Sequence, residues 1–149
     1  MNLTTPSERF VTRSQLSLAL AQQLILQVQL ASQRRGISTA AVVVDGGGNV
    51  LAAARMDKAQ LGALGLATDK AFTAVAFGQP TSSWTASSEP RGKDWGLAAT
   101  LRGRVTVIPG GVPVYHDGGL VGGVGVSGAA AHIDEECANE ALVAAGLEI

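Results

Sequence analysis

The chain has 149 residues, of which 46% are hydrophobic and 15% charged, and its formal net charge is −1. This length fits one domain that buries a core without metal or disulfide support. The near-neutral charge argues against a nucleic-acid-binding protein, which needs a basic face, and no apolar run is long enough to span a bilayer. Cys137 is the only cysteine. An internal disulfide is therefore impossible, and we expect a cytoplasmic protein.

A polar tail, assigned to residues 1–12, precedes the predicted single domain of residues 13–149. Thr12 and Gln15 have the spacing of a helix-capping box, in which a hydroxyl and an amide satisfy free backbone amides of the first turn. Leucines and a valine then recur every four positions, as on a helix face that packs against a core. We therefore predict a helix over residues 14–34.

The middle of the chain predicts a hairpin followed by helices. Residues 40–44 are rich in valine, and a glycine-rich turn separates them from the apolar residues 50–56, a pattern typical of two antiparallel strands. Alanines and leucines at helical spacing predict a helix over residues 61–77. Glu89-Pro90 favours the start of another helix, because proline suits the first helical position.

The last third of the chain predicts three strands and a helix. The strands are expected at residues 105–108, 112–115 and 120–127, separated by glycine-rich turns, and the helix is expected over residues 133–145. Strands and helices do not alternate regularly, so a doubly wound parallel sheet is not favoured. We predict an α+β fold in which helices flank a five-stranded antiparallel sheet.

Four motifs in a fixed order carry a resemblance to a known family. They are Val44-Asp45 with Gly48-Asn49-Val50-Leu51, then Lys70-Ala71-Phe72-Thr73-Ala74, the glycine-rich stretch from Gly110 to Gly128, and Asp134-Glu135 with Cys137-Ala138. In these motifs the chain resembles the GlcG/HbpS-like haem-binding (haem-degrading domain) family, which includes the C-terminal domain of PduO-type corrinoid proteins. The resemblance implies a profilin-like or PAS-like fold and a homo-oligomer, either a dimer or an assembly of dimers. It also implies haem or a corrinoid as a cofactor.

Lys70 is the first candidate for a functional side chain. It lies on a predicted helix among alanines, where burying an ammonium group is costly unless an anion pairs with it. We expect it to contact a carboxylate, propionate or phosphate of a ligand. As a catalytic residue it would instead assist proton transfer. The alternative is a structural lysine paired with Asp57, Asp69 or a neighbouring subunit.

Further candidates are expected around the same pocket. Arg55 has a planar group that binds carboxylates but forms structural ion pairs equally well. Thr73 lies one helical turn from Lys70, and its hydroxyl either donates to a ligand or bonds back to a helix carbonyl. Paired glycines leave room for a flat ligand or for close packing of strands; they are Gly110, Gly111, Gly122 and Gly123.

The chain has two histidines, His116 and His132. His132 and Glu136 are four residues apart at a helix start, so they are candidates for a weak metal site, and His132 is a candidate axial ligand of haem iron. The alternative is a surface histidine. His116 precedes a turn, and we expect it to be exposed.

The sequence therefore predicts a binding protein for haem, another tetrapyrrole or a small organic acid, with a cationic and glycine-lined pocket. The alternative is an enzyme of small organic acid or aromatic catabolism that uses the same pocket for a lyase or isomerase reaction. Neither a GxxxxGK[ST] motif nor a strand–GxGxxG–helix unit is present, so a nucleotide-binding loop is not favoured.

Overall fold

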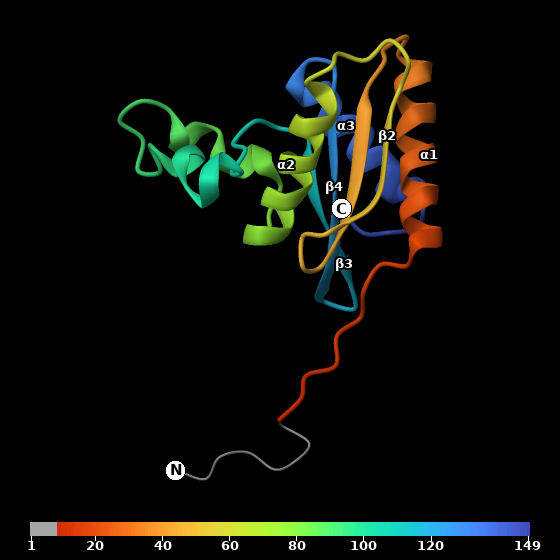
Figure 1. Ribbon diagram of the computed structural model, residues 1–149, viewed down its shortest axis with the longest axis horizontal. Coiled ribbons are helices and arrows are strands. Elements are labelled where there is room, and N and C mark those ends of the chain that lie inside the picture. Colours follow the sequence, from red (N-terminus) through yellow and green to blue (C-terminus); the bar gives the residue numbers. More distant parts are fainter. Residues whose placement is uncertain (1–8) are drawn as a thin grey trace.

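The computed structural model describes residues 9–149, and its centre is a four-stranded antiparallel sheet (Figure 1). The strands are β1 (Ala40–Asp45), β2 (Val50–Arg55), β3 (Gly111–His116) and β4 (Gly119–Ser127), in the spatial order β2-β1-β4-β3. The predicted α+β class and antiparallel sheet are confirmed, whereas the prediction of five strands is wrong. Residues 1–8 of the predicted tail lie outside the described residues, and the domain boundary at residue 13 stays a prediction.

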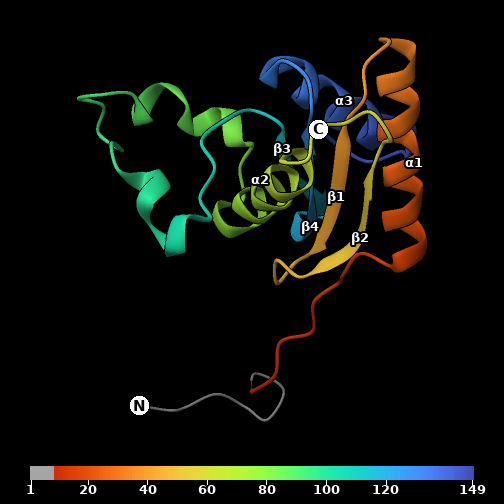
Figure 2. The same cartoon turned by 45° about the horizontal axis from the view of Figure 1, so that its top comes forward.

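Three helices cover the two faces of this sheet (Figures 1 and 2). The helices α1 (Leu18–Arg34) and α3 (Ala131–Ala144) pack on one face, and α2 (Ala63–Phe77) packs on the other. Alternate residues of β1 point to opposite faces of the sheet. Val43 packs with α1 and α3, whereas Val42 packs with α2. Among the described residues, none of the helices is long and apolar enough to cross a membrane.

Helix α1 begins four residues later than the prediction. Ser17 caps its first turn by accepting a hydrogen bond from Leu20 N at 3.1 Å. Gln15, which was expected in the capping box, instead accepts a hydrogen bond at 2.8 Å from Gly46 N in the turn between β1 and β2. The capping-box prediction is therefore wrong, because a tertiary contact uses the amide of Gln15.

The fifth strand is missing because residues 105–108 find hydrogen-bond partners on threonine side chains. Thr106 N donates to the hydroxyl of Thr73 on α2 at 2.9 Å. The hydroxyl of Thr81 donates to the carbonyl of Ile108 at 2.7 Å. These bonds satisfy the backbone locally, so the segment does not need a neighbouring strand.

The helix predicted from Glu89-Pro90 does not form. The chain from residue 81 to residue 103 instead makes short 3-10 turns, at Thr81–Trp84, Ala86–Ser88, Leu97–Ala99 and Leu101–Gly103. Gly96 has a φ of 93°, which a helix cannot accommodate. We call residues 82–104 the arm, because they project from the sheet and its helices (Figures 1 and 2).

Candidate functional site

Lys70 lies in a buried ion pair with a residue distant in sequence. Its side chain is 1% exposed, and its Nζ donates to Oδ2 of Asp134 at 3.1 Å and to the carbonyl of Val126 at 2.9 Å. Asp134 is in the first turn of α3, so the pair links helices on opposite faces of the sheet. The expected anion exists, but it belongs to the chain itself. Asp69, one of the predicted partners, lies 3.7 Å from Nε of Arg104 instead.

Burial dominates the titration of this pair. Burial lowers the pKa of Lys70 and raises the pKa of Asp134, and the attraction between the opposite charges opposes both shifts. The second carboxylate oxygen of Asp134 accepts a hydrogen bond from Ala129 N at 3.0 Å. A ligand would have to open this satisfied pair to reach the amine. Ligand contact by Lys70 therefore stays a prediction.

The glycine-rich strands lie directly against α2. A Cβ on Gly111 would lie 2.2 Å from the carbonyl oxygen of Lys70, and a Cβ on Gly123 would lie 2.9 Å from that of Ala71. A Cβ on Gly110 would meet Nζ of Lys70 at 2.7 Å. Close packing, the alternative given above, therefore accounts for these glycines among the described residues, and the helix fills the space expected for a ligand.

Arg55 and Thr73 each make a local contact to a backbone carbonyl. Arg55 is exposed, and its Nη1 donates to the carbonyl of Ala59 at 3.3 Å. The hydroxyl of Thr73 is buried and donates to the carbonyl of Asp69 at 2.8 Å, as the helix-carbonyl alternative requires. A ligand contact by either residue stays a prediction.

His132 and Glu136 are both exposed on α3. Oε2 of Glu136 accepts a hydrogen bond from Nη2 of Arg35 at 3.4 Å. No group of three or more His, Cys, Asp or Glu side chains that would hold a metal ion occurs within residues 9–149. The weak metal site and the axial haem ligand expected at His132 and Glu136 stay predictions.

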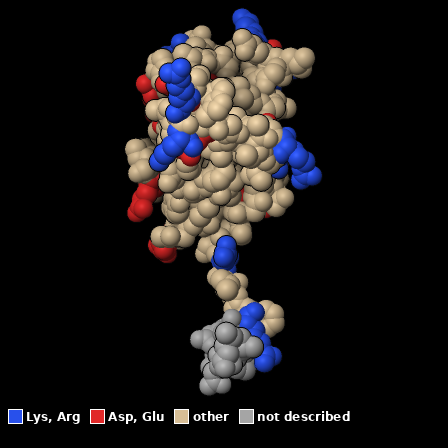
Figure 3. All heavy atoms as spheres, turned by 90° about the vertical axis from the view of Figure 1, so that its left-hand side faces the viewer, with Lys and Arg blue, Asp and Glu red and all other residues tan. Residues whose placement is uncertain are grey.

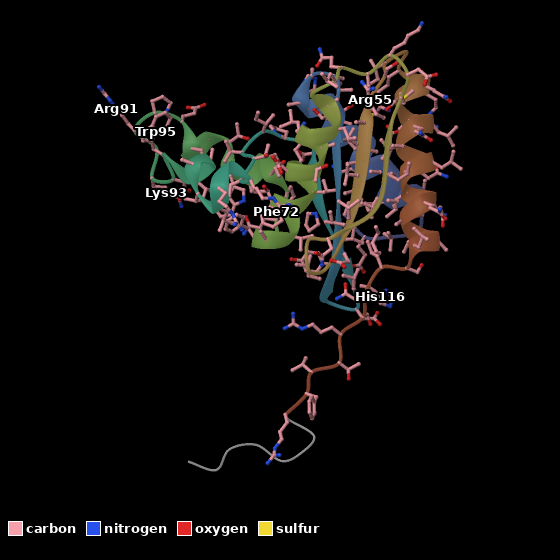
Figure 4. The ribbon with its side chains drawn as sticks, viewed as in Figure 1. Arg55, Phe72, Arg91, Lys93, Trp95 and His116 are labelled. Atoms are coloured by element: carbon pink, nitrogen blue, oxygen red, sulfur yellow. The ribbon has the colours of Figure 1, made fainter. Side chains whose placement is uncertain are left out.

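The other histidine, His116, lies at the end of the β3–β4 hairpin (Figure 4). The two-residue turn Asp117-Gly118 has φ values of 49° and 74°, the left-handed geometry that an Asp-Gly hairpin turn favours. His116 pairs across the hairpin with Gly119, which has no side chain to cover the ring. The imidazole is 59% exposed, and its Nε2 lies 3.4 Å from Oδ2 of Asp117.

The segment before α1 is held next to this hairpin. Leu16 is buried, and its backbone N donates to the carbonyl of Val121 on β4 at 3.3 Å. Gly122 makes this contact possible, because a Cβ there would lie only 2.4 Å from Cδ1 of Leu16. One predicted site residue thus shapes this region, although it does so by admitting a leucine.

Two cavities meet at His116. One, of about 320 Å³, is lined by Thr12, Arg13, Ser14 and the hairpin turn. The other, of about 230 Å³, has a wall of three leucines, Leu16, Leu20 and Leu147, beside polar residues of the segment before α1. His116, Ser14 and Val121 line both. We call the two cavities together the His116 groove.

Sequence reasoning missed this groove for a physical reason. A histidine next to an Asp-Gly turn is a local signal that places the imidazole at a hairpin end. The approach of residues 12–16 to β4 is a tertiary contact, which no local pattern indicates. His116 was accordingly expected to be exposed, and nothing in the sequence pointed to the walls around it.

A larger cavity, of about 470 Å³, lies over an ion-pair network between α1 and α3. Oε2 of Glu140 accepts a hydrogen bond from Arg34 at 3.0 Å, and Oε1 of Glu140 accepts one from Arg35. The hydrogen bond from Arg35 is the main reason that the pKa of Glu140 falls to about 2. The arginine charges are already balanced here, so this cavity is less suited to an anionic ligand than the His116 groove.

Comparison with known proteins identifies the family. A family model described as haem degrading protein HbpS-like matches residues 16–143. The chain belongs to this HbpS-like family. The prediction of a GlcG/HbpS-like relationship is thereby confirmed.

Two curated relatives cover most of this HbpS-like chain. An uncharacterized 15.0 kDa protein of the dhaT-dhaS intergenic region of Citrobacter freundii is 33% identical over 127 residues, which are 85% of this chain and 89% of the relative. Protein GlcG of Escherichia coli K12 is 34% identical over 116 residues, which are 78% of this chain and 84% of GlcG. Neither name assigns a reaction.

Two crystal structures share the fold. Protein ORFY of Klebsiella pneumoniae has a TM-score of 0.92 and 30% identity, with 97% of this chain and 98% of that chain covered. A PduOC:heme complex has a TM-score of 0.86 and 30% identity, with 90% and 97% covered. The second structure shows that a protein with this fold binds haem.

Proposed function

We propose that this HbpS-like chain binds haem, or another flat tetrapyrrole, in the His116 groove. The observation that carries the proposal is a single imidazole that lines both a cavity containing Arg13 and a cavity containing three leucines. Haem brings four nitrogen ligands of its own, so one axial histidine from the protein is sufficient. The groove therefore needs no cluster of metal-binding side chains.

The residues of the groove fit the parts of a haem molecule. The leucines Leu16, Leu20 and Leu147 would contact the apolar ring system. The carboxylate of Asp117 lies 3.4 Å from Nε2 of His116 and would accept the second N–H of the imidazole, as carboxylates do for metal-bound histidines. Bound haem would supply a redox-active iron, and the protein would hold the ring and limit the access of water.

Arg13 supports binding of the acid groups. It lines the more polar cavity together with the hydroxyl side chains of Thr12 and Ser14. A guanidinium group binds carboxylates through paired hydrogen bonds, so these residues would hold either a haem propionate or a free small organic acid. The cationic pocket expected from the sequence would then use Arg13 in place of Lys70.

The relatives support haem more than the other expected ligands. The family description names haem, and PduOC, 30% identical to this chain, has been crystallised with heme. Binding of a corrinoid, also expected from the resemblance, stays a prediction. We also infer a homo-oligomer, as the family resemblance implies, and a cytoplasmic location stays an expectation.

The alternative of an enzyme lacks a comparable observation. It requires an accessible amine with a lowered pKa at Lys70. Burial does lower the pKa of Lys70, but the amine is enclosed and paired with Asp134. Proton transfer to a substrate would need this pair to open.

Titration with haemin tests the proposal, because the chain offers a matched pair of histidine variants. Visible absorption of the unaltered protein should show a Soret band that saturates at a fixed haemin-to-chain ratio. His116→Ala should weaken binding at least about tenfold, since removing an axial ligand removes a coordinate bond. His132→Ala, which changes the exposed histidine of α3, should bind like the unaltered protein.

The outcomes separate the function from the site. Absence of saturation in the unaltered protein would refute haem binding. Saturation that both histidine variants leave unchanged would refute the His116 groove as the site. Excess acetate or glycolate should compete with haemin only if small carboxylates occupy the same cavity.

A further inference from the structure

The arm, residues 82–104, is folded although it buries none of its own residues. It contains 23 residues, and each of them is exposed or only partly buried. It extends from the end of α2 away from the sheet (Figures 1 and 2). Apolar side chains in this segment, such as Trp95 and Leu101, therefore gain little from the folding of a single chain.

The backbone of the arm is nevertheless defined. Asp94 N donates to the carbonyl of Ser87 at 2.9 Å, which closes the outer loop. Arg91, Leu101 and Arg102 have positive φ values of 70°, 49° and 58°, a region that side-chain-bearing residues rarely adopt. Ordering such a backbone costs conformational entropy that burial normally offsets. This indicates that burial of the arm comes from another molecule.

The exposed side chains of the arm are those that anchor protein interfaces. Trp95 is 66% exposed near the tip, between the basic side chains of Arg91 and Lys93 (Figure 4). Tryptophan and arginine are enriched among the residues that carry most of the binding energy of interfaces. Asp94 Oδ2 and Trp84 Nε1 are buried without a hydrogen-bond partner among the described residues. Packing around the arm is therefore incomplete in one chain.

The surface beside the arm is also largely uncharged. Leu61, Leu64 and Phe77, from α2 and the residue pair before it, expose apolar side chains on the same side of the sheet. Figure 3, viewed from the arm's side, shows a broad uncharged area from which a few basic side chains stand out. Large exposed apolar areas commonly mark sites of protein association.

Charge complementarity selects a second copy of this chain as the partner. The arm has four Lys and Arg against two Asp and Glu, whereas the rest of the chain has seven against ten. A basic arm therefore matches the acidic remainder of an identical chain. Two-fold pairing would satisfy both arms at once, and it is the commonest arrangement of homo-oligomers.

We propose that the arm docks on a second copy of this chain, with Trp95 as its anchor, in a two-fold dimer. The inference builds on the homo-oligomer proposed above and adds the surface that forms it. It is independent of the haem groove, which lies on the β3–β4 hairpin and the segment before α1.

Sedimentation velocity over a range of protein concentrations tests the arm. The unaltered chain should form a dimer, and Trp95→Ala should raise the dissociation constant at least about tenfold, as for interface anchors generally. Leu26→Ala is the matched control, because Leu26 is similarly exposed but lies on α1, on the other side of the sheet. This control should dimerise like the unaltered chain.

A charge reversal sharpens the same test. Arg91→Glu combined with Lys93→Glu should weaken the dimer at low salt, and this loss should shrink at 1 M salt, where exposed charges are screened. None of these positions is buried, so circular dichroism of each variant should match that of the unaltered chain. An oligomer that all arm variants leave intact would overturn the proposed surface while the homo-oligomer stands.

Hydrogen exchange provides a second measurement that needs no variant. Backbone amides of residues 82–104 should exchange slowly in concentrated protein and faster after dilution below the dissociation constant, while amides of β1 should not change. A chain that stays monomeric at all concentrations would overturn both the homo-oligomer and the arm surface. Haemin titration of the same sample would still decide the ligand proposal separately.

Discussion

Helix α2 and the arm that follows it have similar small-residue compositions but opposite relations to the sheet. In α2, alanines face glycines of β4 and allow the two backbones to touch: a Cβ on Gly125 would lie 1.9 Å from the carbonyl of Ala67. In the arm, serines, alanines and glycines are also frequent, but none of the residues of this segment is buried. Small side chains therefore produce tight packing only where a partner surface is in register with them.

One large residue interrupts the small-residue contact of α2. Lys70 is among the largest fully buried side chains, and it crosses the end of the sheet to reach Asp134 on α3. The arm contains basic residues as well, but they remain at the surface. The comparison predicts that substitutions in α2 and in the residues that contact it will change the free energy of unfolding strongly. Substitutions in solvent-exposed contacts should change it little.

The largest loss of stability is expected for Lys70→Ala. Removal of one partner leaves Asp134 buried without a counter-charge, which typically costs about 3–5 kcal/mol of unfolding free energy. Replacing both partners, with Lys70→Met and Asp134→Leu, should recover most of this loss, because no charge remains buried. Urea denaturation followed by circular dichroism measures both. A cost below about 1 kcal/mol for Lys70→Ala would show that the pair is not a main anchor of α2.

A smaller loss is expected for Gly125→Ala. The added methyl group would meet the backbone of α2 at Ala67, and such overpacking typically costs about 1–3 kcal/mol. Gly65→Ala is the matched control, because Gly65 lies in α2 with nothing within 4 Å of its added Cβ. This control should stabilise the protein by about 0.5–1 kcal/mol, as alanine does in a helix. Equal thermal midpoints for the two variants would contradict the close contact of α2 with β4.

The smallest effect is expected at the exposed ion pairs of Glu140. Its folded-state pKa of about 2 lies below the ordinary value of 4.5, so its stabilising contribution is present above pH 4.5 and is lost as the pH falls towards 2. Since the side chain is 41% exposed, solvent screening limits this contribution to about 1 kcal/mol or less.

Unfolding measured at several pH values checks this contribution. Glu140→Gln should flatten the acid dependence between pH 4.5 and pH 2, while Glu148→Gln, an exposed position near the end of the chain, should retain it. Parallel acid profiles of the two variants would show that Glu140 does not carry the effect.

The fold was largely predictable because its signals are local. The period of α1 and α2, the glycines after them and the turns between strands all depend on near neighbours in sequence. The prediction of a strand over residues 105–108 was wrong. A β-branched run is typical of a strand, but here threonine hydroxyls from α2 and from Thr81–Trp84 make hydrogen bonds with the backbone of this segment. The helix expected after Glu89 failed because Gly96 and other residues of positive φ break the segment into short turns.

The site was less predictable because its contacts are tertiary. Lys70 was correctly singled out as an amine that needs an anion, but Asp134 is 64 residues away and no local pattern connects them. The glycines indicated that another group approaches the strands closely, but the sequence did not distinguish a helix from a ligand. The cavity beside His116 exists because residues 12–16 lie against β4, and this contact joins parts of the chain that are distant in sequence.

Part of the His116 groove is built from the flank of the chain rather than from its core. Arg13 and Ser14 line the groove, whereas the sheet and its covering helices begin only at Leu18. A protease that cut just before Leu16 would strip these two groups and leave all four strands in place. Ligand capture and folding would thus be separated by a single cleavage.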